Sequence, residues 1–339
     1  MWSVEPLMLV WLEFAVCLVV IAIAGLRLIR YGDRIAALTG LSRSWVGLVL
    51  VATVTSLPEL VTGLSAVTLA QAPDIAVGDA LGSCVFNLAI LAVADVLHRR
   101  APLYAQASSS HMIAAGLGVS LSAAVALALM LSREGVVPAI GHISLASVLL
   151  LILYAGSMRL LFVAEQRSGA NATVMPEPGT MTLKQALMGY SMASVAIVAM
   201  GIWLPHLGVQ VARVMGWSSS FVGTLFVAMA TSLPELATTW GAIRIGAVDL
   251  AFGNLLGSNL FDVLILVLDD VAYTPGPIWS AVAPVHAVSA VMASLMSAVV
   301  IVALASRPAQ RVWHLASWVS MALLALYLFN AVVQYLHGH

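Results

Sequence analysis

VGLVLVATVTSLPE at residues 46–59 and VGTLFVAMATSLPE at residues 222–235 are two versions of one sequence, in register at an offset of 176. After a gap of one residue the likeness continues, because GDALGSCVFN at 78–87 matches GNLLGSNLFD at 253–262. Polar groups recur at matching places in otherwise apolar sequence, which chance explains poorly. The two stretches therefore indicate an internal duplication.

Hydropathy places both copies in a membrane. With 62% hydrophobic and 9% charged residues, the chain of 339 residues is too apolar to cover itself with a polar surface in water. A helix needs about 20 mainly apolar residues to cross a bilayer. Ten stretches meet this requirement: 7–29, 45–70, 75–97, 109–132, 141–164, 185–207, 221–245, 248–272, 281–305 and 312–335.

Five predicted helices fall in each copy, and an odd number makes the second copy enter the membrane from the opposite side. The sequence thus predicts an all-α polytopic membrane protein with ten transmembrane helices, arranged as two inverted five-helix repeats. The expected units are a first repeat at 1–164 with its motif at 46–91, a linker at 165–183, and a second repeat at 184–339 with its motif at 222–266.

Orientation is predicted from the fourteen basic residues. All but Arg133 and Arg213 fall at alternate loops or helix ends, which positive-inside bias assigns to the cytoplasm. We therefore expect a multi-pass protein of the plasma (inner) membrane with both termini outside and a cytoplasmic linker.

Each copy of the Thr-Ser-Leu-Pro-Glu motif is expected to break a helix and bind ions. Proline removes a backbone donor and frees carbonyl groups one turn earlier. In lipid such carbonyls need a partner, and a dehydrated cation is an apt one. The neighbouring hydroxyl groups supply further oxygen ligands: Thr55, Ser56, Thr231 and Ser232.

Glu59 and Glu235 follow the two prolines, deep within apolar sequence. A charge at such depth costs about 2.5–3.5 kcal/mol on insertion scales. Two facing carboxylates also repel each other, so they need a cation between them or protons. Hard oxygen ligands suit calcium, sodium or magnesium, and the motifs offer none of the imidazole or thiolate of a zinc or copper site.

The helices that follow add a polar stripe in each copy. Asp79, Ser83 and Asn87 are spaced i, i+4, i+8 and so share one helix face, and Asn254, Ser258 and Asp262 repeat the pattern. Small polar residues in membrane helices often serve packing alone, but beside the duplicated motif we expect them to bind ions. Because the carboxylate changes place between the stripes, the predicted site is asymmetric in charge.

Other polar residues are predicted to have structural or solvent-facing roles and not to bind ions. We expect Asp95, Asp269 and Asp270 to be solvated because they lie near predicted helix ends. A structural or vestibule role is predicted for Glu13, Cys17 and Cys84 are interpreted as core residues, and the histidines suggest no cluster.

These motifs are similar to the alpha repeats of the sodium/calcium exchanger family, within the cation/calcium exchangers. The resemblance covers nearly the whole chain and implies a 5+5 division with both termini outside. It also implies a role for the first and sixth helices, which are expected to slide across the other eight.

The resemblance implies a ligand set as well. Glu59 and Glu235 would bind calcium with backbone oxygens of Thr55 and Thr231, and Asn87 with Asp262 would complete the centre. Sodium sites would use Ala52, Ser56 and Ser83 in one copy, and Ala228, Thr231, Ser232 and Ser258 in the other, each with its glutamate. Asp79 stands where the family has Asn, which makes it an additional candidate ligand. Val54, Ala230 and Cys84 also depart from the family pattern.

The function predicted is secondary active antiport of calcium against sodium by alternating access. The alternative is a proton-coupled antiporter of calcium, manganese or another divalent cation, although the TSLPE form favours sodium. Two broken helices that meet at charged residues argue against a membrane scaffold, and the inverted duplication favours alternating access over a channel. No HExxH or nucleophile elbow points to an enzyme. Expected partners are inorganic cations and the lipid bilayer, with no nucleic acid, no obligatory protein partner and no cofactor.

Overall fold

The computed structural model describes residues 4–39, 55–98, 102–167, 181–308 and 317–338. Within these ranges every regular element is a helix, apart from a small antiparallel hairpin of β1 (Ala139–Ile140) and β2 (Ile143–Ser144). The predicted all-α class is confirmed.

The helices divide between the two halves of the chain. The first half contains α1 (Val4–Thr39), α4 (Leu57–Thr68), α5 (Pro73–Leu97), α6 (Leu103–Gln106), α7 (His111–Arg133) and α8 (Leu145–Arg167). The second contains α9 (Leu183–Met215), α10 (Ser219–Val222), the π-helix η2 (Gly223–Val227), α11 (Ala228–Thr231), α12 (Leu233–Arg244), α13 (Val248–Ala272), α14 (Ile278–Ala281), α15 (His286–Ser306) and α16 (Trp318–His337).

Eight helices in the described ranges are long and apolar enough to span a membrane. A ninth span is the pair Ser219–Thr231 and Leu233–Arg244, which is bent by 46° at its break. These nine agree with nine of the ten predicted stretches. The other stretch, 45–70, begins outside the described residues, and its described part is α4.

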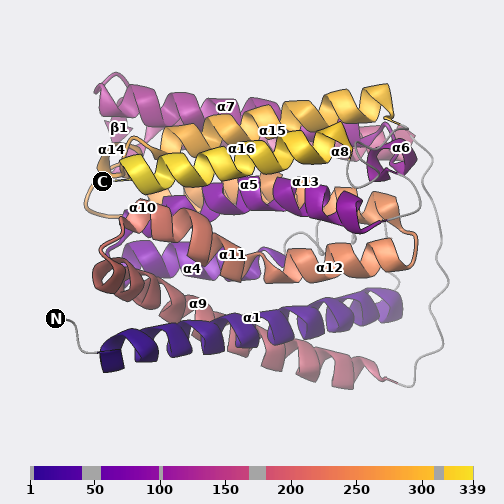
Figure 1. The fold of residues 1–339 in the computed structure, drawn as a ribbon, viewed down its shortest axis with the longest axis horizontal. Coiled ribbons are helices and arrows are strands. Elements are labelled where there is room, and N and C mark those ends of the chain that lie inside the picture. Colours follow the sequence, from indigo (N-terminus) through magenta and orange to yellow (C-terminus); the bar gives the residue numbers. More distant parts are fainter. Residues whose placement is uncertain (1–3, 40–54, 99–101, 168–180, 309–316, 339) are drawn as a thin grey trace.

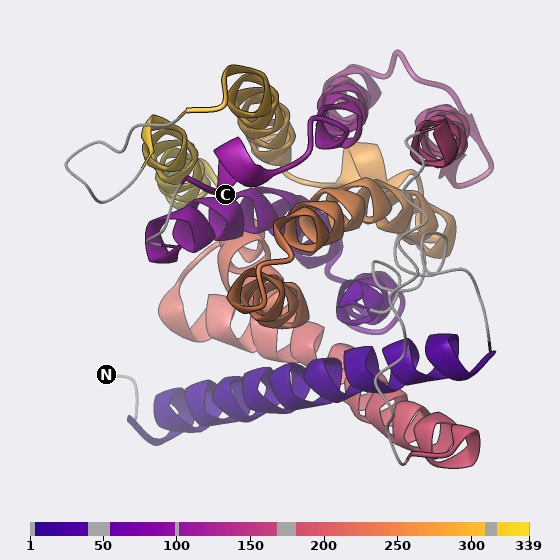
Figure 2. The ribbon, with the colours of Figure 1, turned by 90° about the vertical axis from the view of Figure 1, so that its right-hand side faces the viewer.

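The spans form three layers (Figures 1 and 2). The two longest helices, α1 with 36 residues and α9 with 33, cross each other on one side. The mostly buried α5 and α13 lie in the centre with α4 and α12, while α7, α8, α15 and α16 cover the far side. The first residues of α1 and the last of α16 lie at the same end, here named the terminal end (Figure 1).

Asp95 and Asp270 connect the centre to the far side. The expectation that they, with Asp269, are solvated was wrong, because all three side chains are fully buried. Asp95, near the end of α5, accepts hydrogen bonds from Leu103 N at 2.7 Å and from Ser320 Oγ, in the first turn of α16, at 2.6 Å. A carboxylate near a helix end becomes buried here because another helix begins against it.

Asp270 repeats this arrangement with the halves exchanged. It accepts hydrogen bonds from Ile278 N at 2.8 Å and from Ser147 Oγ, in the first turn of α8, at 2.5 Å. Asp95 of the first half thus holds a helix of the second half, and Asp270 of the second holds a helix of the first.

Two Asp–His pairs are exchanged in the same way. Asp74 Oδ1, in the first turn of α5, lies 3.0 Å from His286 Nε2 at the start of α15. Asp249 Oδ1, in the first turn of α13, lies 3.1 Å from His111 Nε2 at the start of α7. These two histidines each pair with an acid across the halves, which the sequence analysis did not predict.

A candidate ion-binding site at the two helix breaks

The second motif bends its span at Ser232, and the start of α4 at Ser56 has the same local structure. These two points, Thr55–Ser56 and Thr231–Ser232, are called the two breaks, and residues 45–54, which precede the first, lie outside the described residues. Ser56 precedes α4 with φ −86° and ψ 12°, and Ser232 precedes α12 with φ −82° and ψ 12°. In each case proline occupies the first turn, where its missing N–H removes no helical hydrogen bond. Each glutamate stands in that same first turn, where the positive end of the helix dipole stabilises an anion.

The predicted ligands converge in the buried centre of the bundle. Each of those described has a relative exposure of 1% or less: Thr55, Ser56, Glu59, Asp79, Ser83, Asn87, Ala228, Thr231, Ser232, Glu235, Ser258 and Asp262. Ala52, a predicted sodium ligand, lies outside the described residues, as does Val54. These polar side chains come from α4, α5, α11, α12, α13 and the two breaks.

Glu59 accepts a hydrogen bond from the serine at the break of the other half. Ser232 Oγ donates a hydrogen bond to Glu59 Oε1 at 3.1 Å and lies 3.0 Å from Ser83 Oγ. A hydroxyl has one proton, so Ser232 can give it to the carboxylate and accept from Ser83. Glu59 Oε2 is buried with no hydrogen-bond partner.

Glu235 has the reciprocal environment. Ser56 Oγ donates to Glu235 Oε1 at 3.4 Å, and Ser258 Oγ donates to the same oxygen at 3.3 Å. Thr55 Oγ1 lies 3.4 Å from Ser258 Oγ, which brings the first break against α13. Glu235 Oε2 is likewise buried without a partner. Each glutamate therefore belongs to one half and is held by the serine of the other.

The two aspartates that break the repeat symmetry also face this centre. Asp79 Oδ1 accepts a hydrogen bond from Thr231 Oγ1 at 2.8 Å. Asp262 Oδ2 accepts one from Cys84 Sγ at 3.4 Å. The remaining oxygens, Asp79 Oδ2 and Asp262 Oδ1, are buried and unpartnered. Like the glutamates, each aspartate keeps one oxygen available to a ligand.

An amide network joins the two stripes. Asn87 Nδ2 donates to Asn259 Oδ1 at 3.0 Å, and Asn259 Nδ2 donates to the Cys84 carbonyl at 3.0 Å. Asn87 is thus directed toward Asn259, and no hydrogen bond between Asn87 and Asp262 is found among the described residues. Asn259 was not among the predicted ligands, although it occupies the place of Cys84 in the duplicated sequence.

The charges define what this centre can bind. Among the described residues no Lys or Arg is buried, so no fixed cation balances the four carboxylates. Nor do any three His, Cys, Asp or Glu side chains in the described ranges come close enough to hold one metal ion. The arrangement offers instead single carboxylates beside hydroxyl groups, which are oxygen ligands of the kind that hard cations prefer.

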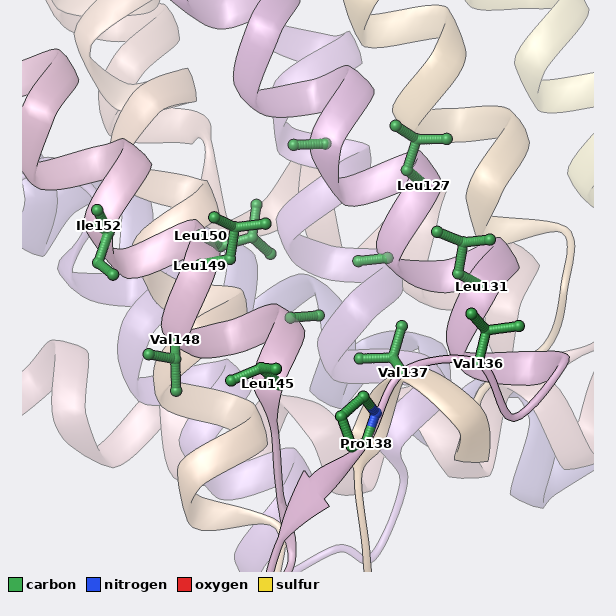
Figure 3. A pocket seen from close by; sticks show the side chains of 13 residues that line it. Leu127, Leu131, Val136, Val137, Pro138, Leu145, Val148, Leu149, Leu150 and Ile152 are labelled. Atoms are coloured by element: carbon green, nitrogen blue, oxygen red, sulfur yellow. The ribbon is translucent and has the colours of Figure 1, made fainter.

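A pocket in the described part of the chain lies apart from this centre. A recess of about 540 Å³ between α7 and α8 is lined by hydrocarbon side chains (Figure 3). Four of them are more than half exposed on the surface: Leu127, Val136, Leu149 and Ile152. A recess without charged or hydroxyl groups has no ligands for an inorganic cation.

Comparisons with known proteins agree with the duplication. The family model described as sodium/calcium exchanger protein matches residues 9–163 and 186–336. The inner membrane protein YrbG of Escherichia coli (strain K12) is 29% identical over 284 residues, covering 76% of this chain and 80% of that protein. The putative antiporter CaxA of Alkalimonas amylolytica is 28% identical over 263 residues, covering 76% and 78%.

Solved structures share the fold. The sodium-calcium exchanger NCX_Mj covers 96% of this chain and 98% of its own, with a TM-score of 0.60 and 20% identity. YfkE covers 95% and 92%, with a TM-score of 0.63 and 19% identity. Since the family model spans most of both halves, the chain belongs to the sodium/calcium exchanger family, whose members are secondary transporters and not enzymes.

Proposed function

We propose that this protein exchanges calcium for sodium across the membrane by alternating access. The observation that carries the proposal is the set of four buried carboxylates, each with one oxygen hydrogen-bonded and one without a partner among the described residues. Buried charges of one sign require neutralisation. Cations bound by Glu59, Glu235, Asp79 and Asp262 would supply it, with the hydroxyl groups of both breaks as further ligands.

The proposed architecture is ten transmembrane helices in two inverted repeats, 1–164 and 184–339, joined by the linker 165–183. The exchanged contacts of Asp95 and Asp270 support it, because each half makes the same contact with the other. We also propose that the protein lies in the inner membrane with both termini outside. The shared end of α1 and α16 supports the part of this proposal that puts the two termini on one side (Figure 1).

Unequal registers of α1 and α9 support a sliding motion. Gly25 of α1 lies against Pro234, so that a Cβ there would overlap the proline ring. Its counterpart on α9, Gly201, lies against Val61, three residues beyond the matching Pro58. Three residues correspond to about 4.5 Å of helix rise. In the proposed cycle the pair α1 and α9 exchanges these registers, which opens the centre to each face in turn.

The test is calcium uptake into proteoliposomes under an imposed sodium gradient or an imposed proton gradient. The proposal expects uptake that follows the sodium gradient and persists when the pH is equal on both sides. Asp79 and Asp262 favour the alternative, because two carboxylates beyond the glutamates could carry protons. Uptake that follows the proton gradient and ignores sodium would establish that alternative instead.

A further inference from the structure

Asp269 is a buried carboxylate that the central site does not use. Its side chain is fully buried three residues before the end of α13, and neither oxygen has a hydrogen-bond partner among the described residues. Asp270, its neighbour, accepts hydrogen bonds at both oxygens and holds α8. Anchoring the helix end therefore explains Asp270 and leaves Asp269 without a structural role.

The space for this carboxylate is made by Gly63. A Cβ added at Gly63 would lie 2.7 Å and 2.8 Å from the two Asp269 oxygens, closer than such contacts allow. Gly63 stands one turn beyond Glu59 on α4, so the Asp269 carboxylate packs on the helix that carries the central glutamate.

Duplication does not account for this pair. The positions that match Gly63 and Asp269 in the other half are Thr239 and Ala94, where the small and polar partners are interchanged and no charge is present. Thr239 and Ala94 line one common apolar recess, so the two positions also lie together in that half. The acid is thus specific to one half of the bundle.

Asp269 lies toward the terminal end, and the next carboxylate inward is Asp79. Both side chains are buried, so as carboxylates they would repel each other. Asp79 in turn accepts a hydrogen bond from Thr231 at the second break. In the duplicated sequence Asp79 matches Asn254, and Asp269 matches Ala94. Both of these matching residues are uncharged. The side of the centre toward the terminal end therefore carries two acids whose counterparts toward the opposite end are uncharged.

We propose that Asp269 binds a divalent cation as it passes between the terminal end and the Glu59–Glu235 centre, with Asp79 as the next ligand inward. A buried carboxylate without partners needs a counter-charge, and calcium brings two positive charges to two acids. The binding itself stands apart from the exchange reaction, whereas its place on a transport route rests on the proposed function.

The first experiment measures initial rates of exchange against calcium concentration at each face of proteoliposomes containing wild-type protein or Asp269→Asn. The variant preserves shape and removes charge, so half-saturation at the terminal-end face should require about three- to tenfold more calcium. Half-saturation at the opposite face should stay unchanged. Equal shifts at both faces, or no shift at either, would overturn the proposal.

A second variant tests the geometry without changing the acid. Gly63→Ala places a Cβ where the carboxylate lies, so it should raise half-saturation at the terminal-end face as Asp269→Asn does. Thr239→Ala, at the matching position of the other half, is the control and should leave that face unchanged. A Gly63→Ala protein that behaves as wild type at both faces would contradict the proposed position of the acid.

The third experiment does not depend on transport. Equilibrium binding of radioactive calcium is measured on purified protein that carries Glu59→Gln and Glu235→Gln together, with and without Asp269→Asn. Residual calcium binding that is lost on adding Asp269→Asn supports the site, and absent or unaffected residual binding overturns it. Failure of wild-type exchange with this residual binding intact would refute the proposed function and leave the cation site standing.

Discussion

Replacing Glu59 with Gln tests the central site most directly, because glutamine keeps the shape of the side chain. The hydrogen bond from Ser232 can be retained, since the amide oxygen of glutamine accepts as Glu59 Oε1 does. What changes is the second oxygen, Oε2, which is buried and without a partner and would become an uncharged NH₂ donor.

The expected loss follows from the lost charge. Two unit charges 4 Å apart interact by about 4 kcal/mol at an effective dielectric constant of 20, and the double charge of calcium makes this about 8 kcal/mol. If desolvation of the carboxylate offsets half of that energy, about 4 kcal/mol is lost, which corresponds to about a thousandfold weaker calcium binding.

The assay is calcium uptake by sodium-loaded proteoliposomes, together with the calcium-induced rise in melting temperature of the purified protein. Glu59→Gln should abolish uptake and sharply reduce the calcium-induced rise, while the protein without calcium should melt no lower than wild type because a buried, unneutralised acid has been removed. Ser232→Ala is the matched control, because it removes the hydrogen bond to Glu59 and keeps the charge. Losing one hydrogen bond to a charged group costs about 1.5–3 kcal/mol, so this variant should weaken calcium binding less than Glu59→Gln does. Near wild-type uptake by Glu59→Gln would refute the assignment of this centre.

Four further outcomes follow from the structure. Asp262→Asn should alter the sodium dependence of calcium exchange more than equilibrium calcium binding, and unchanged sodium dependence would remove Asp262 from the sodium ligands. Asp79→Asn should have a milder effect on the same assay, because an amide oxygen can still accept from Thr231. Gly201→Leu should slow exchange while calcium binding is retained, since a larger side chain obstructs the contact with α4; equal loss of binding and exchange would argue against sliding. Single cysteines in the linker 165–183 should react with an impermeant thiol reagent only from the cytoplasmic side, and labelling from outside would invert the proposed topology.

Much of the fold could be predicted because both main signals are local. Apolar length located the spans, and the repeated motif located the two breaks before any contact was known. The π-helix η2 was not predictable, since its neighbouring residues have no distinctive composition. Its beginning is explained by packing instead: Gly223 lies against the backbone of Ile75 so closely that a Cβ would lie 3.0 Å from it.

The errors concern partners that are distant in sequence. Asp95 and Asp270 were expected to be solvated because they lie near helix ends. The serines that bind them stand at the beginning of helices of the other half, so sequence neighbours gave no sign of these contacts. The Asp74–His286 pair was missed for the same reason. A signal was nevertheless present, because extending the repeat at an offset of 175 pairs Asp74 with Asp249 and His111 with His286.

The geometry is consistent with the predicted ligand set but does not test which residues bind ions. Its described members are buried together, but which ion each one binds stays a prediction. Asn259 could have been included from its place opposite Cys84. The thiol that Cys84 directs at Asp262 was not foreseeable, because the sequence shows only that a small residue replaces an amide.

The reciprocal hydrogen bonds of Ser56 and Ser232 have a consequence for how such a protein is made and how it arose. Ser56 and Ser232 each donate to the glutamate of the other half, so these two contacts form only after the second half has been synthesised and inserted. In the proposed inverted topology, a half produced alone would have to find a copy of itself inserted in the opposite direction. An ancestor of half this length would then have worked as a dimer of oppositely oriented subunits, and gene fusion would have fixed the two orientations in one chain.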